Sequence, residues 1–280
     1  MQKREGKIFE RLPLFSSAEN VLIGKDLGAI WRNKGVRALL MLLPVVLVVV
    51  IPLVYSVGIS FLPVEGNPSF PEPLAKLLGN PQKNACRQLW MGAFTTLLCP
   101  MLFLCVPILC SVIAASQVFV REKEEGTLET LFLSSLDTTM ILHAKILCCT
   151  LLSIAISAIS FVAFAITVSV ADLCMGAPYF LNLRWIVCLV LLMPVVALFS
   201  VIFVCWELPR VYSFVEALQT MGYLLLPLLL LFLVQLTGVF EITVPVLLVI
   251  VVLLGVASIL LFNRTNRLFQ PEKLFPGTGE

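Results

Sequence analysis

Six long stretches of this sequence contain no charged residue. Each stretch holds at least 22 residues, and 22 residues of α-helix rise roughly 33 Å, enough to cross a hydrocarbon core about 30 Å thick. Inside a bilayer no water satisfies the backbone, so such a segment must be a helix or belong to a closed barrel. The stretches are uniformly apolar rather than alternating, which favours helices. They cover residues 38–64, 88–120, 146–171, 185–206, 217–240 and 242–263.

These stretches predict an all-α integral membrane protein with six transmembrane helices in a single domain, residues 1–280. The composition agrees, because only 13% of the residues are charged, against about 25% in a typical soluble domain. Only Glu241 divides the last two stretches, and Gly238 and Pro245 flank it, so we expect a tight hairpin there. The expected spans cover about 38–62, 90–120, 146–171, 185–206, 217–239 and 242–262, with tails at 1–18 and 263–280.

The distribution of basic residues predicts the orientation of the chain. Six spans place both termini on one side, and fifteen of the 19 Lys and Arg residues fall on that side. Lys and Arg accumulate in cytoplasmic loops, so we expect both termini in the cytoplasm. The two main outer loops, at about 64–87 and 172–183, are too short for a folded domain. The four outer basic residues are Lys76, Lys83, Arg87 and Arg184.

Residues 19–37 have the pattern of an amphipathic helix that precedes the first span. Apolar residues alternate with charged ones, and a Trp lies at the edge. This pattern favours a helix that lies in the plane of the membrane surface; the alternative is an ordinary basic flank of the first span. The apolar set is Val21, Leu22, Leu27, Ile30 and Trp31, and the charged set is Lys25, Asp26, Arg32 and Lys34.

The cysteines indicate packing rather than metal binding. Seven of the nine lie in or beside expected spans, where a thiol serves as a small apolar group. Cys86 and Cys174 fall in the two outer loops, and spacing alone leaves open whether they form a disulfide. His143 is the single histidine, so no Cys/His metal spacing exists. It also cannot complete a metalloprotease site with Glu124 and Glu125.

The loop after the second expected span carries a distinctive pattern. Residues 121–125 are all charged, and Gly126 offers a break. Thr127 can cap a short helix in whose first turn Glu129 suits the helix dipole. Two hypotheses remain open: this loop docks a cytoplasmic partner, or its apolar ridge packs on the protein's own spans or on lipid. The ridge consists of Leu128, Leu131 and Phe132, which share one helical face.

Residues 122–131, followed by Ile141 and Lys145, resemble the signature of type-2 ABC transporter permeases. In that family, an E-x-E-x-G-T-L-E segment after the second span leads to a short coupling helix, and a basic elbow helix precedes the first span. Residues 19–37 and the six-span layout are similar to this arrangement. Two departures exist. Ser134-Ser135 stands where the family has Thr-Pro or Ser-Pro, and Ala144 replaces the Gly of a Gly-Lys pair.

The resemblance implies a permease subunit of an ATP-driven exporter in a bacterial plasma (inner) membrane. Two permease subunits, identical or different, would pair, and each would dock a separate cytoplasmic ATPase that holds ATP and Mg²⁺. The chain lacks the G-x-x-x-x-G-K-[ST] phosphate-binding loop, so we expect no enzymatic activity of its own. The implied ATPase-coupling residues are Glu122, Glu124, Glu125, Gly126, Thr127, Leu128, Glu129, Leu131 and Phe132.

The transport route is less clear from the sequence. No charge falls deep in an expected span, which argues against a proton relay, and the weakly polar interior suits lipid-like, peptide or drug-like cargo. Other functions remain as alternatives: a secondary transporter or channel, or a non-transporting membrane anchor or signalling subunit. Nothing indicates a nucleic-acid partner. The sparse polar residues line a pathway or form interhelical hydrogen bonds; they are Gln117, Gln219, Tyr223, Gln235 and Thr237.

Overall fold

The computed structural model describes residues 17–61, 86–128, 137–175, 182–236 and 243–268, and every regular element in these ranges is helical. Six of the described helices are long and apolar enough to cross a membrane. The protein is therefore an all-α, multi-pass membrane protein, as the charge-free stretches predicted. The candidate spans are Lys34–Ser60, Trp90–Glu124, Thr138–Cys174, Leu183–Glu207, Phe214–Gln235 and Val244–Leu268.

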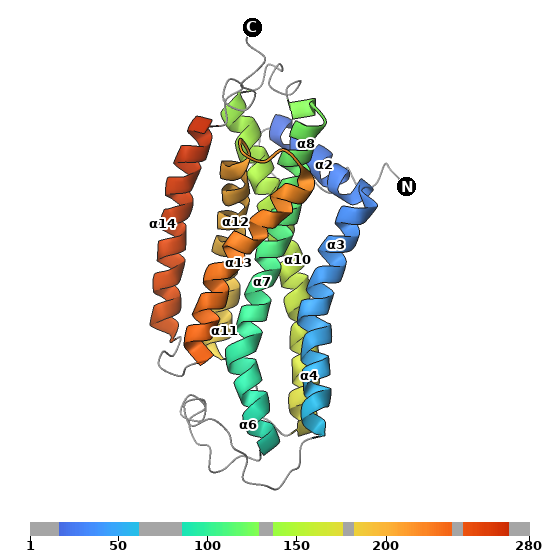
Figure 1. Cartoon of the computed structure of the whole chain (residues 1–280), viewed down its shortest axis with the longest axis vertical. Helices are drawn as coiled ribbons and strands as arrows, with labels where there is room; N and C mark the ends of the chain where they lie inside the picture. The colour runs from blue at the N-terminus through green and yellow to red at the C-terminus, as the bar shows by residue number, and fades with distance from the viewer. Residues whose placement is uncertain (1–16, 62–85, 129–136, 176–181, 237–242, 269–280) are drawn as a thin grey trace.

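The helices run side by side as a bundle (Figure 1). Helix α2 (Ser17–Arg32), helix α8 (Arg121–Glu124) and the connection from the fourth span to the fifth lie at one end, which we call the α2 end. Helix α6 (Cys86–Ala93) lies at the opposite end, the α6 end. The first span comprises α3 (Lys34–Val45), η1 (Val46–Val50) and α4 (Ile51–Ser60), and the second comprises α6, η3 (Phe94–Leu98), α7 (Cys99–Ala115), η4 (Ser116–Val120) and α8. The third span is α10 (Thr138–Met175), and the fourth comprises α11 (Leu183–Val187), η5 (Cys188–Leu192) and α12 (Met193–Glu207). The fifth is α13 (Phe214–Leu236) and the sixth is α14 (Val244–Leu268).

The third and the last span extend furthest beyond the ends of their charge-free stretches. The third span begins at Thr138 rather than near residue 146, because Asp137 caps it: its carboxylate accepts from the Thr139 amide and hydroxyl. Lys145 consequently lies about two turns inside helix α10. The last span continues to Leu268. Charged residues near a span end are tolerated when they lie among protein groups or extend to the interface.

Within the described ranges, the four η segments are single π-helical turns, and three of them lie one residue before a proline. Ile51, Cys99 and Met193 each donate a backbone hydrogen bond to the carbonyl five residues earlier. Each is followed by a proline, at 52, 100 and 194. A proline disfavours the α-conformation of the preceding residue and lacks an N–H, so a wider turn at this point absorbs the strain. The fourth π turn, η4, precedes no proline.

Helix α2 is amphipathic, and its break from the first span is at Asn33 rather than at residue 37. Asn33 adopts an extended backbone and its side chain accepts from the Gly35 amide, so it caps α3. The buried face of α2 differs from the expected one. Val21 is exposed, whereas Asp26 is buried in line with Ile30. The structure thus corrects the assignment of Asp26 to the charged face, since Asp26 lies four residues before Ile30 on the same helical side.

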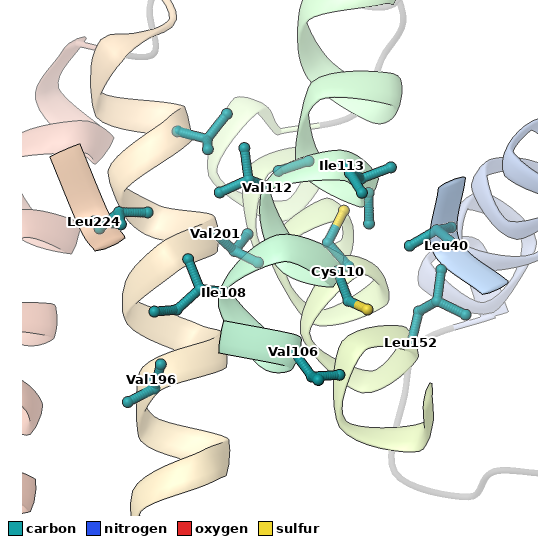
Figure 2. Packing of buried hydrophobic residues seen from close by; sticks show 14 of the residues in the cluster. Leu40, Val106, Ile108, Cys110, Val112, Ile113, Leu152, Val196, Val201 and Leu224 are labelled. Atoms are coloured by element: carbon teal, nitrogen blue, oxygen red, sulfur yellow. The ribbon is translucent and has the colours of Figure 1, made fainter. Parts of the chain in front are cut away.

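Helix α7 forms the centre of the bundle and packs against α3, α10, α12 and α13. Figure 2 shows its apolar side chains among those of these neighbours, Leu40, Leu152, Val201 and Leu224. Within this apolar core, Ser153 of α10 donates to the carbonyl of Pro107 at 3.0 Å and accepts from the Ser111 hydroxyl at 2.9 Å. Hydroxyl bonds of this kind join helices where the surroundings offer no water.

Candidate functional site

A buried ionic cluster joins three helices at the α2 end. Lys145 of α10 is fully buried, and its Nζ lies 2.8 Å from Glu122 Oε2 and 3.3 Å from Asp26 Oδ2. The Nζ also donates to the Val118 carbonyl of η4 at 3.5 Å and lies over the Phe119 ring. Lys25 completes the cluster at its exposed side, 3.1 Å from Glu122 Oε1. One cation therefore binds α2, the second span and the third span together.

The pKa of Asp26 reflects the burial of this cluster. Burial raises the pKa of the Asp26 carboxyl above its usual value; the charge of Lys145 opposes this rise and the charge of Glu122 adds to it. A buried carboxylate beside a second carboxylate is unfavourable without a cation between them. Lys145 supplies that cation, so its removal would leave two acidic groups close together in a poorly hydrated place.

Gln117 extends the cluster toward the start of the first span. Its Oε1 accepts from Asn33 Nδ2 at 3.3 Å and from Arg121 at 3.4 Å. Arg121 in turn pairs with Glu125 at 3.0 Å, one helical turn further on. Gln117 is buried, and it lies in the π turn η4. In the structure Gln117 therefore acts as a connector between the α2–α3 break and α8.

Lys123 joins the same segment to the connection between the fourth and fifth spans. Its Nζ donates to the carbonyls of Leu208 at 2.7 Å and Val211 at 3.0 Å, with a longer contact to Pro209. It also lies over the Tyr212 ring, 4.8 Å from the centroid. The last carbonyls of a helix have no partner within the helix, and a cation suits them. Lys123 therefore binds the C-cap residue of α12, Leu208, and the turn that follows it.

The segment that follows turns sharply at Gly126. This glycine has a φ of +71°, a backbone conformation that favours glycine. The break expected there is confirmed. The Thr127 hydroxyl donates back to the Glu122 carbonyl at 3.2 Å, and Leu128 is fully buried, so this part of the apolar ridge packs against the protein itself. Glu124 and Glu125 are exposed, whereas Glu129, Leu131 and Phe132 lie outside the described residues.

The described polar residues considered for a transport route lie in three different places. Gln117 belongs to the ionic cluster, and Gln219 and Tyr223 are exposed on α13, with Tyr223 70% exposed. Gln235 is buried near the other end of α13, where it lines a cavity. Thr237 lies outside the described residues. Of the described residues in this set, Gln117 forms the interhelical hydrogen bond of the second alternative.

The structure also places the Asp172 carboxylate in a membrane-spanning helix, where the sequence predicted none. Asp172, assigned by the sequence to the second outer loop, lies inside α10, and 4% of it is exposed. Its Oδ2 is buried without a hydrogen-bond partner. The helix continues because the first strong stop signals, Gly176 and Pro178, come later. Cys174 is exposed with a free thiol, so the described Cys174 is not in a disulfide. Among the described residues, no three metal-ligating side chains gather.

No protein-family model, curated protein or solved structure matches this chain. The functional proposal therefore depends on the sequence pattern and on the contacts of the chain's own residues.

Proposed function

We propose that this chain is the membrane-spanning permease subunit of an ATP-driven exporter of the type-2 ABC class. The segment from Glu122 through the loop after Leu128 receives a separate cytoplasmic ATPase, which binds the ATP and Mg²⁺. The E-x-E-x-G-T-L-E pattern between the second and third spans supports this proposal, as does the amphipathic helix before the first span. The excess of basic residues at the α2 end supports a cytoplasmic position for that end.

The observation that carries the proposal is the set of charged contacts at the base of the Gly126 turn. Glu122 binds Lys145 of α10 and Lys25 of α2, and its neighbour Lys123 binds the end of α12. A force applied to this segment therefore reaches the third span, the elbow helix and the fourth span directly. Coupling requires a physical element that both sites act on, and α8 with its contacts is such an element.

A second copy of a permease subunit belongs to the proposed assembly. The partner is identical or closely related, and substrate crosses in response to closure of the two ATPases. Glu124 and Glu125 are exposed beside the turn and are available for basic groups of the ATPase. Charged rims of this kind set the choice and orientation of a partner more than its affinity.

Reconstitution of the complex tests the proposal. The tagged chain is purified with its associated proteins, a P-loop ATPase is identified by peptide sequencing, and ATP hydrolysis is measured in proteoliposomes. We expect Phe132→Asp or Gly126→Pro to separate ATP hydrolysis from transport while the spans remain inserted. The matched control is Phe61→Asp at the α6 end, where Phe61 is 82% exposed; this variant should behave as wild type.

Two results would contradict the proposed function. One is the absence of any P-loop ATPase from the purified complex; the other is normal coupling in both Phe132→Asp and Gly126→Pro. Size-exclusion profiles of the variants distinguish a loss of docking from a loss of folding.

A further inference from the structure

A cavity lies between four of the spans and extends from the α6 end toward the middle of the bundle. Its volume is about 140 Å³. The second, fourth, fifth and sixth spans line it, together with Asn182, which directly precedes the fourth. Among the described residues, the first and third spans contribute nothing to the lining. The cavity is therefore separate from the coupling residues and the ionic cluster of the α2 end.

Irregular backbone borders this cavity on two sides. Leu97 belongs to the π turn η3, and Cys188 and Leu192 belong to the π turn η5. A π turn widens a helix locally, and such turns occur frequently at functional sites. Pro100, which follows η3, is itself part of the lining, and a proline cannot donate the backbone hydrogen bond of a regular helical turn. Two helices thus depart from regular α-helical geometry where they line the cavity.

The volume of the cavity sets the size of its occupant. A cavity of about 150 Å³ with apolar walls takes one benzene ring. Most of the lining here is apolar, and every one of the four spans contributes a leucine to it: Leu104, Leu192, Leu231 and Leu254. The cavity therefore suits a compact, uncharged molecule with about the size of a single aromatic ring.

The lining also favours an aromatic ring over an aliphatic one. Trp185 lines the cavity and is 4% exposed. Its ring packs on those of Phe164 and Phe103, with centroids at 5.1 and 6.2 Å, so its orientation is fixed. Rings gain from edge-to-face or offset contact with another ring. Met101 and Cys188 bring sulfur atoms to the lining, and sulfur contacts aromatic edges favourably.

Gln235 offers the buried polar group that would orient this ring. Its side chain is 7% exposed and lines the cavity, and no hydrogen bond engages it within the described part of the chain. A buried amide without partners is unfavourable, and a ligand hydroxyl could donate to its Oε1 or accept from its Nε2. Thr96 already donates its hydroxyl to the Gly92 carbonyl at 2.7 Å. Asn182 and Arg184 border the cavity but are exposed, so the lining contains no buried charge.

We propose that this cavity binds one small, neutral aromatic molecule that carries a hydroxyl group, such as a phenol. The ring lies among Trp185, Leu104 and Leu231, and the hydroxyl meets the Gln235 amide. This binding is independent of the proposed ATPase coupling, because it uses one copy of the chain and no residue of the α2 end. A failure of either proposal therefore leaves the other intact.

Fluorine NMR on the purified full chain in detergent tests this binding site. The probe is 4-fluorophenol, and its transverse relaxation is followed as protein is added. We expect Leu231→Trp, which fills the cavity, to weaken binding by about tenfold or more. The matched control is Leu230→Trp: Leu230 is the preceding residue on α13 and is 53% exposed, so this variant should bind as wild type does. Micelles absorb the probe equally in all samples, so the difference between the variants comes from the protein.

The role of the amide is tested with a second probe, 4-fluorotoluene, in which a methyl group replaces the hydroxyl. Gln235→Leu removes the amide at a similar side-chain volume. We expect this variant to bind 4-fluorophenol about three- to tenfold more weakly, the value of one hydrogen bond, and to bind 4-fluorotoluene at least as tightly as wild type does. This contrast needs no cavity-filling variant, so it holds even if Leu231→Trp does not fold.

Three outcomes would overturn the proposal. Equal binding of 4-fluorophenol by Leu231→Trp and Leu230→Trp, with both variants eluting as wild type does, would place the probe at the bundle surface. Unchanged binding of 4-fluorophenol in Gln235→Leu would show that the amide does not contact the hydroxyl. An equal loss of both probes in Gln235→Leu would show that the amide only maintains the shape of the cavity.

Discussion

Lys145 is the residue on which the α2 end of the bundle depends. It is fully buried and has carboxylate partners on α2 and on α8. A buried charge is tolerated only when it is well paired, and the loss of one partner is costly because the other charge stays behind. The three charges are not equivalent, however. Lys145 is the buried cation between Asp26 and Glu122, whereas Glu122 also pairs with the exposed Lys25.

This asymmetry predicts a ranking of two substitutions. Lys145→Met leaves Asp26 and Glu122 without their buried cation, so we expect it to lower the free energy of unfolding by about 3–5 kcal/mol. Asp26→Asn leaves Lys145 paired with Glu122 and removes a carboxylate that burial disfavours, so we expect a loss of about 1 kcal/mol or less. Unfolding of the purified protein in mixed micelles, followed by circular dichroism, measures both values.

The double variant Lys145→Met with Asp26→Asn is the control for this ranking. It should be more stable than Lys145→Met alone, because Glu122 still pairs with Lys25 and the buried Asp26 carboxylate, which would lack its ion-pair partner, is gone. An Asp26→Asn variant as unstable as Lys145→Met would show that the pair with Glu122 cannot hold Lys145.

At the scale of the elements, the special backbone geometry lies in the π turns within the spans and in the turn at Gly126. Three spans contain a π turn one residue before a proline, and the second span has a further π turn, which carries Gln117, just before α8. After that turn, α8 lasts a single turn and stops at Gly126 with its positive φ. The direction of the backbone at Thr127 and Leu128 therefore depends on one glycine.

Two glycine substitutions should change stability in opposite directions. Gly126→Ala meets no neighbouring atom within 4 Å, but an L-residue in this conformation costs about 1–2 kcal/mol. Gly24→Ala, on the exposed side of α2, also meets open space and should gain up to about 1 kcal/mol of helix stability. Hydrogen exchange of residues 17–32 and 121–128 measures both local effects. Faster exchange in Gly24→Ala, or no change in Gly126→Ala, would contradict this explanation.

For the whole molecule, the spans differ greatly in how much of them the chain itself covers. The most apolar window of Trp90–Glu124 is 72% buried, against 11% for Val244–Leu268 and 17% for Phe214–Gln235. The second span is therefore the axis of the bundle. The exposed apolar sides of α13 and α14 are suited to contact with lipid chains or with another membrane subunit, since lipid and apolar side chains are equally apolar.

Thiol labelling tests the predicted orientation of the whole molecule. Cys174 is exposed at the α6 end of α10, whereas Cys99, Cys110, Cys148, Cys149, Cys188 and Cys205 are buried. In a Cys86→Ser background, a membrane-impermeant maleimide should label intact cells at Cys174, and Cys174→Ser should abolish this signal. Val215→Cys is made in the Cys86→Ser, Cys174→Ser background, at a site that is 68% exposed near the α2 end. It should be labelled only after permeabilisation. The reverse pattern would place both termini outside the cell.

The sequence by itself determined the fold class, the number of spans and the break at Gly126. It could do so because each of these depends on local rules. A lipid-embedded segment must satisfy its own backbone, so a long charge-free run is a helix wherever it lies. A glycine after a charged turn likewise marks a break without reference to distant residues. The basic excess at one end is also a property of the sequence alone.

The tertiary structure decided which polar groups are buried and what they contact. Lys145 and Asp26 are 119 positions apart, and no local pattern indicates that α2 presents an acid to the third span. The burial of Leu128 and Asp172, the contact of Lys123 with the end of α12, and the cavity beside Gln235 have the same origin. Each depends on side chains from helices that are distant in sequence and meet only when the bundle packs, because burial and charge pairing are properties of the assembled surroundings.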